Sequence, residues 1–178
     1  MKIAFIGKIA SGKSTCCNYL KKLDSSFEIT SFAKMVKHIA TTLFFMKHKD
    51  RVLLQQIGRK MREISPTVFI DYVLHETDDG DKNFLLDDAR YINEIETLDL
   101  NEWILIKLVI SKKLQKQRII ERYPDTYQTH LDRLTHESEM EQELIPDYIY
   151  SHIIYVDDLS IEQLYSMLLE IYTKYKKK

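Results

Sequence analysis

The stretch "KIAFIGKIASGKST", Lys2 to Thr15, decides the fold. Its first five residues are mostly apolar and predict a buried strand that ends before Gly7. The eight residues from Gly7 to Ser14 match the pattern G-x-x-x-x-G-K-[ST] at every fixed position, and Thr15 follows them. A helix is predicted from Lys13 to Leu23, so the pattern lies between a strand and a helix. That is the context in which it forms a phosphate-binding loop.

Backbone geometry explains the residue types of this loop. The chain has only four glycines, and Gly7 and Gly12 both fall within six residues. Glycines let backbone N–H groups turn toward a phosphate, and the N-terminus of the following helix adds a partial positive charge. A chance match in a turn is the alternative that we set aside. The residues that we expect to contact ATP are Gly7, Ala10, Ser11, Gly12, Lys13, Ser14 and Thr15, with Lys13 between the β- and γ-phosphates and Ser14 on Mg²⁺.

The rest of the chain alternates strands with helices, which predicts an α/β fold with a parallel sheet covered on both faces. We expect five strands in a single P-loop NTPase domain that spans residues 1–178, without internal repeats or linkers. The predicted strands are 2–6, 27–32, 84–86, 103–111 and 152–156. The predicted helices are 13–23, 33–46, 50–64, 68–74, 112–122 and 160–176, and Ser160 with Gln163 forms a capping box in the last of them.

Composition excludes several classes of protein. The net charge is −1 over 178 residues, so no overall field attracts nucleic acid or membrane. The terminal "KYKKK" fits a solvated helix end, with a nucleic-acid tail as the alternative.

The cysteines Cys16 and Cys17 are adjacent, which fits small core residues in a reducing compartment. The N-terminus lacks a signal-peptide pattern, and no apolar run approaches the ~18 residues of a membrane span. We expect a cytoplasmic protein with small-molecule partners, and a homodimer stays open.

A second informative stretch is "NFLLDDARYINE", Asn83 to Glu94. The apolar strand runs into Asp87 and Asp88, and its carboxyl end is expected to open onto the nucleotide crevice of a doubly wound sheet. There Mg²⁺ and Lys13 or Arg90 would neutralise the two acids. Because side chains alternate along a strand, the acids cannot face the same way. We place Asp87 with Ser14 on the metal and Asp88 toward the acceptor, with the reverse assignment open. The alternative is that Asp88 caps a following helix.

Three classes of phosphate-loop protein compete. Regulatory GTPases need a later N-K-x-D, which is absent from this chain, and transport or motor ATPases are usually much longer. A small metabolite kinase needs an acceptor-binding segment and an arginine-bearing lid. Residues 112–143 are our lid candidate, since Arg118 and Arg122 share one helix face and Arg133 follows. Ordinary solvated helix arginines are the alternative.

The acceptor side is expected within residues 31–75, which place several cations at helical spacing. A monophosphate acceptor needs a fixed cation, and Lys37 and Arg62 are our candidates, with a solvated face as the alternative for each. Phe32, Phe44 and Phe45 could wall a base pocket, although core packing is the interpretation that we favour for them.

Several of these segments together resemble the deoxynucleoside monophosphate kinases of phages and large DNA viruses, a branch of the adenylate-kinase-like P-loop kinases. The resemblance is carried, in the family's order, by "GKIASGKST", "SFAKMVK", "KDRVLLQQIGRKMREI", "LLDDARYINEIETL" and "HLDRLTHESE". It implies transfer of the γ-phosphate of ATP to a deoxynucleoside monophosphate, with Mg²⁺, in deoxynucleotide biosynthesis. It also implies that residues 156–159 border the adenine. Base preference varies in such families and does not transfer.

This interpretation assigns roles to individual residues. Lys13, Arg118, Arg122 and Asp88 form the catalytic group, in which Asp88 is not assigned as a base and Arg118 also contacts ATP. Substrate binding is assigned to Phe32, Lys37, Gln55, Arg62, Asp88, Arg90, Glu94 and Arg133. Two rival functions stay open. The first is a kinase of the same scaffold with another acceptor, such as dephospho-coenzyme A or phosphomevalonate, and the second is an ATP-binding regulatory protein without turnover.

Overall fold

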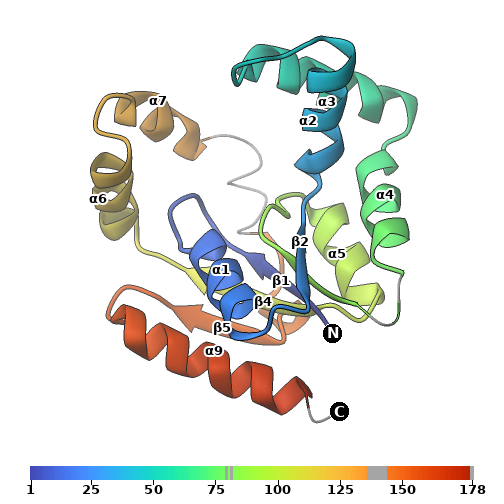
Figure 1. Ribbon diagram of the computed structural model, residues 1–178. Coiled ribbons are helices and arrows are strands. Elements are labelled where there is room, and N and C mark those ends of the chain that lie inside the picture. Colours follow the sequence, from blue (N-terminus) through green and yellow to red (C-terminus); the bar gives the residue numbers. More distant parts are fainter. Residues whose placement is uncertain (79, 81, 136–143, 177–178) are drawn as a thin grey trace. The chain divides into compact units, whose positions relative to one another are not determined.

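The computed structural model describes residues 1–78, 80, 82–135 and 144–176 (Figure 1). Five strands form one parallel sheet in the order β2-β3-β1-β4-β5. The strands are β1 (Lys2–Ile6), β2 (Phe27–Thr30), β3 (Asn83–Leu86), β4 (Ile104–Val109) and β5 (His152–Tyr155). Because β1 pairs in parallel with both β3 and β4, the phosphate-loop sequence follows the central strand. The predicted fold class is confirmed.

Helices connect these strands, and the six that the sequence predicts lie close to their expected bounds, whereas the helices at 92–100 and 127–131 were not among the predicted ones. The helices are α1 (Lys13–Leu23), α2 (Ala33–Leu43), α3 (Arg51–Ile64), α4 (Val68–Glu76), α5 (Ile92–Leu100), α6 (Lys112–Arg122), α7 (Tyr127–Leu131) and α9 (Ile161–Lys176). The described residues also include the short 3-10 helices η1 (Asp132–Thr135) and η3 (Asp147–Ile149). The helix expected to reach residue 46 ends at Leu43 instead. No helix in the described ranges is long and apolar enough to cross a membrane.

The chain divides into two compact units. The first comprises Met1–Ile29 and Lys82–Lys178 and holds most of the sheet, the phosphate loop and α6. The second comprises Thr30–Asp81, in which α2 packs against α3 and α4 follows. The predicted acceptor segment, residues 31–75, falls within this second unit.

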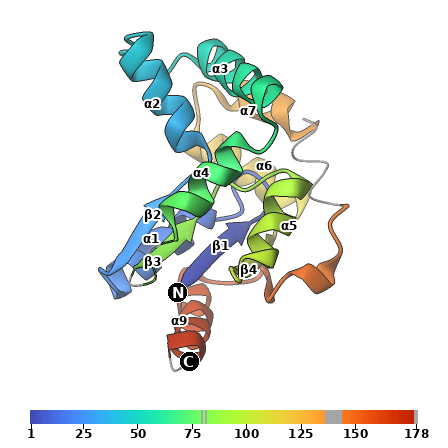
Figure 2. The same ribbon diagram turned by 90° about the vertical axis from the view of Figure 1, so that its right-hand side faces the viewer.

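The core of the first unit follows the alternation of side chains along the strands. Ile3 and Phe5 of β1 join Leu85 of β3 in the cluster that also holds buried residues of α1 and α9. The intervening residues Ala4 and Leu86 are equally buried but lie outside that cluster. Figures 1 and 2 show α5 on the other side of the sheet from α9. The sheet is therefore covered on both faces, as the apolar strands predict.

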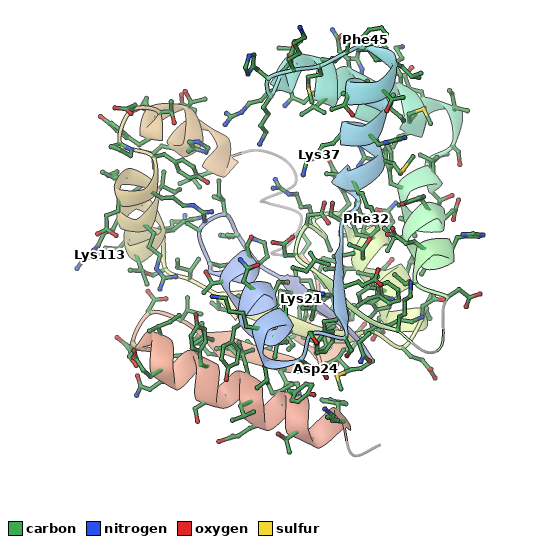
Figure 3. The ribbon with its side chains drawn as sticks, in the orientation of Figure 1. Lys21, Asp24, Phe32, Lys37, Phe45 and Lys113 are labelled. Carbon is green, nitrogen blue, oxygen red and sulfur yellow. The ribbon has the colours of Figure 1, made fainter. Side chains whose placement is uncertain are left out.

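Local hydrogen bonds fix the ends of the helices. The Ser160 N–H donates to Gln163 Oε1 over 2.8 Å and the Gln163 N–H donates to Ser160 Oγ over 3.2 Å, so the predicted capping box is confirmed. At the end of α1, Lys21 donates to the backbone carbonyls of Ser25 and Phe27. Asp24, which follows α1, accepts a 2.6 Å hydrogen bond from the Tyr172 hydroxyl of α9. Figure 3 labels Lys21 and Asp24 at this end of α1.

Candidate active site

The phosphate loop adopts backbone conformations that explain its glycines. Gly7 has φ +151° and Gly12, the residue before α1, has φ +104°. A Cβ on Gly7 would lie 2.5 Å from the Leu108 carbonyl oxygen, so the loop packs directly on the backbone of β4. Ala10 also has a positive φ of 65° although it carries a side chain. The loop therefore stores backbone strain at a position where its neighbours must compensate for it.

Polar groups of the loop suit a phosphate ligand. The Ser11 hydroxyl is buried and has no hydrogen-bond partner among the described residues. The Lys13 ammonium donates to the carbonyl oxygens of Gly7 and Lys8, the latter over 2.9 Å, so its charge lies over the loop. A buried hydroxyl donor, a lysine and the N-terminus of α1 converge here, which is the donor set that phosphate oxygens require.

The metal prediction concerns Ser14 and Asp87, which the structure brings together. Ser14 Oγ, in the first turn of α1, donates to Asp87 Oδ2 over 2.5 Å. Asp87 follows β3 and continues the alternation that turns Leu85 toward α1. A hydroxyl and one carboxylate fit Mg²⁺, which usually keeps several waters and takes one or two carboxylates. Among the described residues, no group of three metal-ligating His, Cys, Asp or Glu side chains is found.

The segment between β3 and α5 tests whether Asp88 caps the following helix. The suggestion that Asp88 caps the next helix is wrong, because α5 begins at Ile92 and Tyr91 is its N-cap residue. The buried carboxylate of Glu94 instead accepts the backbone N–H groups of Arg90 and Tyr91, over 2.8 and 3.1 Å. Asp88 is half-buried and Arg90 is exposed. The side chain of Glu94 therefore holds the backbone of Arg90 in place.

Helix α6 contributes two side chains to the phosphate loop. The guanidinium of Arg118 donates to the Ala10 carbonyl over 3.3 Å, so Arg118 lies at the phosphate loop. One turn earlier, the Gln115 amide donates to the Ile9 carbonyl over 3.0 Å. The sequence interpretation missed Gln115, although its place three residues before Arg118 and four before the buried Ile119 was a usable signal. The guanidinium of Arg122 lies 5.5 Å from the centre of the Tyr123 ring instead, and Arg122 is exposed.

The start of α6 is tied to the loop after β5. Ser111, the N-cap residue of α6, accepts from the Leu114 N–H through its hydroxyl. Its own N–H donates to both carboxylate oxygens of Asp157, over 2.9 and 3.2 Å. Hydrogen bonding from the Ser111 side chain and then from its backbone N–H lowers the pKa of Asp157, and the charge of Arg118 lowers this pKa further. Residues 156–159, which the family resemblance places beside the adenine, are thereby linked to α6.

The predicted acceptor residues of the second unit lie in different environments. Phe32 is buried next to the start of α2, whereas Lys37 on α2 and Gln55 on α3 are exposed. The Arg62 guanidinium lies 5.0 Å from the centre of the Phe69 ring and donates to the Gly58 carbonyl over 3.4 Å. Arg62 is thus held in place, while Lys37 projects from its helix (Figure 3).

Two aromatic residues in this unit overturn an expectation. Core packing was favoured for Phe44 and Phe45, but they are 55% and 80% exposed. Phe45 also has a positive φ of 53°, which is uncommon for a bulky residue. Helix α2 ends just before them at Leu43, so the turn carries both rings outward. Core packing holds for Phe32 alone.

The predicted lid is only partly described. Arg133 lies in η1 and its side chain is outside the described part, as are residues 136–143. Of the three predicted lid arginines, the structure therefore brings Arg118 to the phosphate loop and gives Arg122 a contact with Tyr123.

A cavity of about 310 Å³ borders the first residues of the loop. Lys107 and Asp147 line it and form an ion pair with a 2.7 Å separation. Tyr150 also lines it, and burial followed by the charge of Asp147 raises the Tyr150 pKa to about 12. Lys8 of the phosphate loop lines the cavity as well, so its charge remains beside the loop after Lys107 and Asp147 neutralise each other.

Comparisons with known proteins identify the fold. No family model matches the sequence, and no curated protein matches it. Among solved structures, a dephospho-CoA kinase from Campylobacter jejuni matches with a TM-score of 0.61 at 20% identity, over 99% of this chain and 98% of that chain. A thymidylate kinase from Candida albicans matches with a TM-score of 0.58 at 16% identity, over 98% and 92%.

A third solved structure is a shikimate kinase from Acinetobacter baumannii in complex with shikimate. It matches with a TM-score of 0.58 at 17% identity, over 99% of this chain and 95% of that chain. The three proteins are named for different acceptors, and identities this low establish the fold alone. Over nearly its whole length, the chain has the P-loop NTPase fold that these small-molecule kinases share.

Proposed function

We propose that this chain is a Mg²⁺-dependent kinase that transfers the γ-phosphate of ATP to a deoxynucleoside monophosphate. The hydrogen bond between Ser14 and Asp87 beside a complete phosphate loop is the observation that carries the proposal. It joins the loop to an acid at the carboxyl end of the neighbouring strand, where a metal on the β- and γ-phosphates would need its ligands. The acceptor class rests on the family resemblance of the sequence.

Each residue of the donor side has a role in this proposal. The loop N–H groups and the Ser11 hydroxyl bind phosphate oxygens, and Lys13 turns from the loop carbonyls to the β- and γ-phosphates. Ser14 and Asp87 would hold Mg²⁺, which supplies charge neutralisation between the two phosphates. Arg118 and Arg122 add positive charge to the transferring group. The attacking group is a phosphate oxygen of the acceptor, so Asp88 need not accept a proton.

On the acceptor side, the cations Lys37, Arg62 and Arg90 would hold the monophosphate. Glu94 acts in this proposal by fixing the backbone of Arg90, as its two hydrogen bonds suggest. Phe32, Gln55, Asp88 and Arg133 complete the proposed substrate-binding residues. The proposed reaction would serve viral deoxynucleotide biosynthesis, which is what the family resemblance implies.

A coupled assay of ADP formation tests the proposal. The purified chain is given Mg-ATP and each of the four deoxynucleoside monophosphates in turn, and at least one should stimulate ADP release strongly. Lys13→Met should abolish this turnover. Lys22→Met, an exposed lysine of the same helix, is the matched control and should leave it unchanged. ADP release that no nucleoside monophosphate stimulates would overturn the acceptor assignment.

A second candidate is a kinase of the same scaffold with another acceptor. The match to a dephospho-CoA kinase over 99% of this chain favours testing that compound first. Dephospho-coenzyme A and phosphomevalonate therefore belong in the same panel, and stimulation by one of them alone would select this candidate. ATP binding without stimulation by any acceptor would select the regulatory candidate.

A further inference from the structure

Gln115 is a buried polar residue on a helix that otherwise carries mostly charged or exposed side chains. It is 2% exposed, and within α6 only Gln115 and Ile119 are buried. A buried amide costs free energy unless its hydrogen bonds are made. The described donor bond of Gln115 goes to the Ile9 carbonyl, 106 residues away in the sequence and inside the phosphate loop. The side chain is therefore committed to the loop.

The contact belongs to a larger connection between α6 and the donor side of the site. Arg118, one turn further along α6, holds the next carbonyl of the loop, that of Ala10. Ala10 is the loop residue with a left-handed φ of 65°, a conformation that an alanine keeps only if its surroundings enforce it. At the N-terminus of α6, the N–H of Ser111 donates to the Asp157 carboxylate. The first two turns of α6 are thus anchored to the loop after β5 and to the phosphate loop.

The orientation of one peptide group gives this anchor a consequence for nucleotide binding. In a trans peptide, the carbonyl of one residue and the N–H of the next point in opposite directions. The structure contains no cis peptide bond among its described residues. When Gln115 holds the Ile9 carbonyl toward α6, the Ala10 N–H must therefore point away from α6. Loss of the Gln115 donor would remove one restraint on the orientation of this peptide, beside the strained Ala10.

We propose that Gln115 is a positioning residue for the donor nucleotide, because it keeps the Ile9–Ala10 peptide oriented with its N–H available to phosphate oxygens. The proposal rests on the nucleotide-binding half of the function proposed above and is independent of the acceptor. Arg118 contacts phosphate in the proposed reaction, whereas Gln115 acts only through the backbone of the loop.

The test compares Gln115→Met, which keeps the side-chain length and removes the donor, with Gln117→Met. Gln117 is the matched control, since it is exposed on the same helix and its amide binds Glu121. Isothermal titration measures the affinity of each protein for ADP and for inorganic tripolyphosphate. For Gln115→Met we expect about tenfold weaker binding of both ligands, the effect of one lost hydrogen bond to a partly buried carbonyl. The control should bind as the wild type does.

The tripolyphosphate measurement separates positioning from a general loss of structure. If Gln115 acts on the phosphate loop, both ligands should weaken by the same factor in protein that remains folded by circular dichroism at the titration temperature. An ADP affinity within twofold of the wild type would overturn the proposal. So would a loss that is confined to ADP.

Gln115→Glu provides a second measurement in case the methionine variant folds poorly. Its carboxyl has the same shape as the amide, can donate to the Ile9 carbonyl only when protonated, and should have a raised pKa because it is buried. Relative to the wild type at each pH, its ADP affinity should recover as the pH falls from about 8 to about 6. A ratio that does not change with pH would count against the hydrogen bond as the cause.

These outcomes are distinct from failure of the proposed function. If the wild type binds ADP but phosphorylates no acceptor, the proposed kinase activity is overturned. The binding affinities of Gln115→Met and the wild type can still be compared in that case. A wild type that binds neither ADP nor tripolyphosphate overturns both proposals. Weak binding by Gln115→Met together with normal acceptor-dependent turnover at saturating ATP supports both.

Discussion

The Ser14 hydroxyl and the Asp87 carboxylate lie 2.5 Å apart although 73 residues separate them in the sequence. Ser14 is in the first turn of α1, and Asp87 follows β3, which pairs with β1. Parallel pairing brings the carboxyl ends of β1 and β3 to the same edge of the sheet, so the residues that follow these two strands meet there. The pair follows directly from the topology.

The first prediction concerns the division of roles between Asp87 and Asp88. Asp87→Asn should raise the Mg²⁺ concentration for half-maximal activity at least about tenfold, because it removes the charge beside Ser14. Asp88→Asn should leave that Mg²⁺ dependence near the wild-type value. Activity measured in a magnesium titration at fixed ATP checks both, and a larger effect of Asp88→Asn would reverse the assignment.

The second prediction compares three glycines. Gly7→Ala would place a Cβ 2.5 Å from the Leu108 carbonyl and 2.9 Å from Ser11 Oγ, at a φ of +151°. We expect a loss of about 3 kcal/mol or more in the free energy of unfolding. Gly12→Ala meets no atom within 4 Å and suffers only from its φ of +104°, so its cost should be about 1–2 kcal/mol. Gly80→Ala has open space and should stay within about 0.5 kcal/mol of the wild type in urea unfolding.

The third prediction concerns the two thiols of α1. Burial raises the pKa of Cys16 to about 12, and burial together with the negative charges of Asp87 and Asp88 raises the pKa of Cys17. Because only a thiolate reacts readily, neither thiol should react with Ellman's reagent at pH 8 in the folded chain. Both should react once guanidinium chloride unfolds it. Rapid labelling of one thiol in the folded protein would show that α1 opens or packs differently.

The fourth prediction concerns the contact between α1 and α9. Hydrogen bonds from Ser26 and from the Tyr172 hydroxyl lower the Asp24 pKa from its ordinary value of 3.8. A lowered pKa in the folded state contributes stability above the ordinary value, and this stability is lost as the pH falls below it. Tyr172→Phe should therefore cost about 1 kcal/mol near pH 5.5 and less near pH 3. Urea unfolding at the two pH values measures this difference, and an equal cost at both would exclude Asp24 as the partner responsible.

The sequence predicted the parts of the fold that depend on local pattern. The strand before Gly7 and the helix after Gly12 follow from local apolar pattern, and the start of α9 follows from its capping residues Ser160 and Gln163. The pairing of Ser14 with Asp87 could also be anticipated, since both follow parallel strands. Cys16 and Cys17 were expected in or near the core, and both are buried there.

Features that depend on contacts between distant segments were not predictable in the same way. Asp88 matches the local pattern of a helix cap, but the buried Glu94 carboxylate satisfies the N–H groups of Arg90 and Tyr91 from inside the helix. Phe44 and Phe45 look like core residues, yet the end of α2 turns them outward. Glutamine is usually exposed to solvent, so the sequence alone does not indicate that Gln115 is buried. Its amide donates to the Ile9 carbonyl, and that contact depends on how the phosphate loop lies against α6.

Because side chains alternate along β3, the number of residues in this strand determines which of Asp87 and Asp88 faces α1. Leu85 faces the α1 and α9 core, and Asp87, two residues on, reaches Ser14. Deleting one residue from β3 would reverse this parity, so that Asp88 would follow the apolar side chains onto the α1 side. The length of a four-residue strand therefore determines which carboxylate meets the helix, and a one-residue deletion there would put Asp88 in the place of Asp87 without altering either residue.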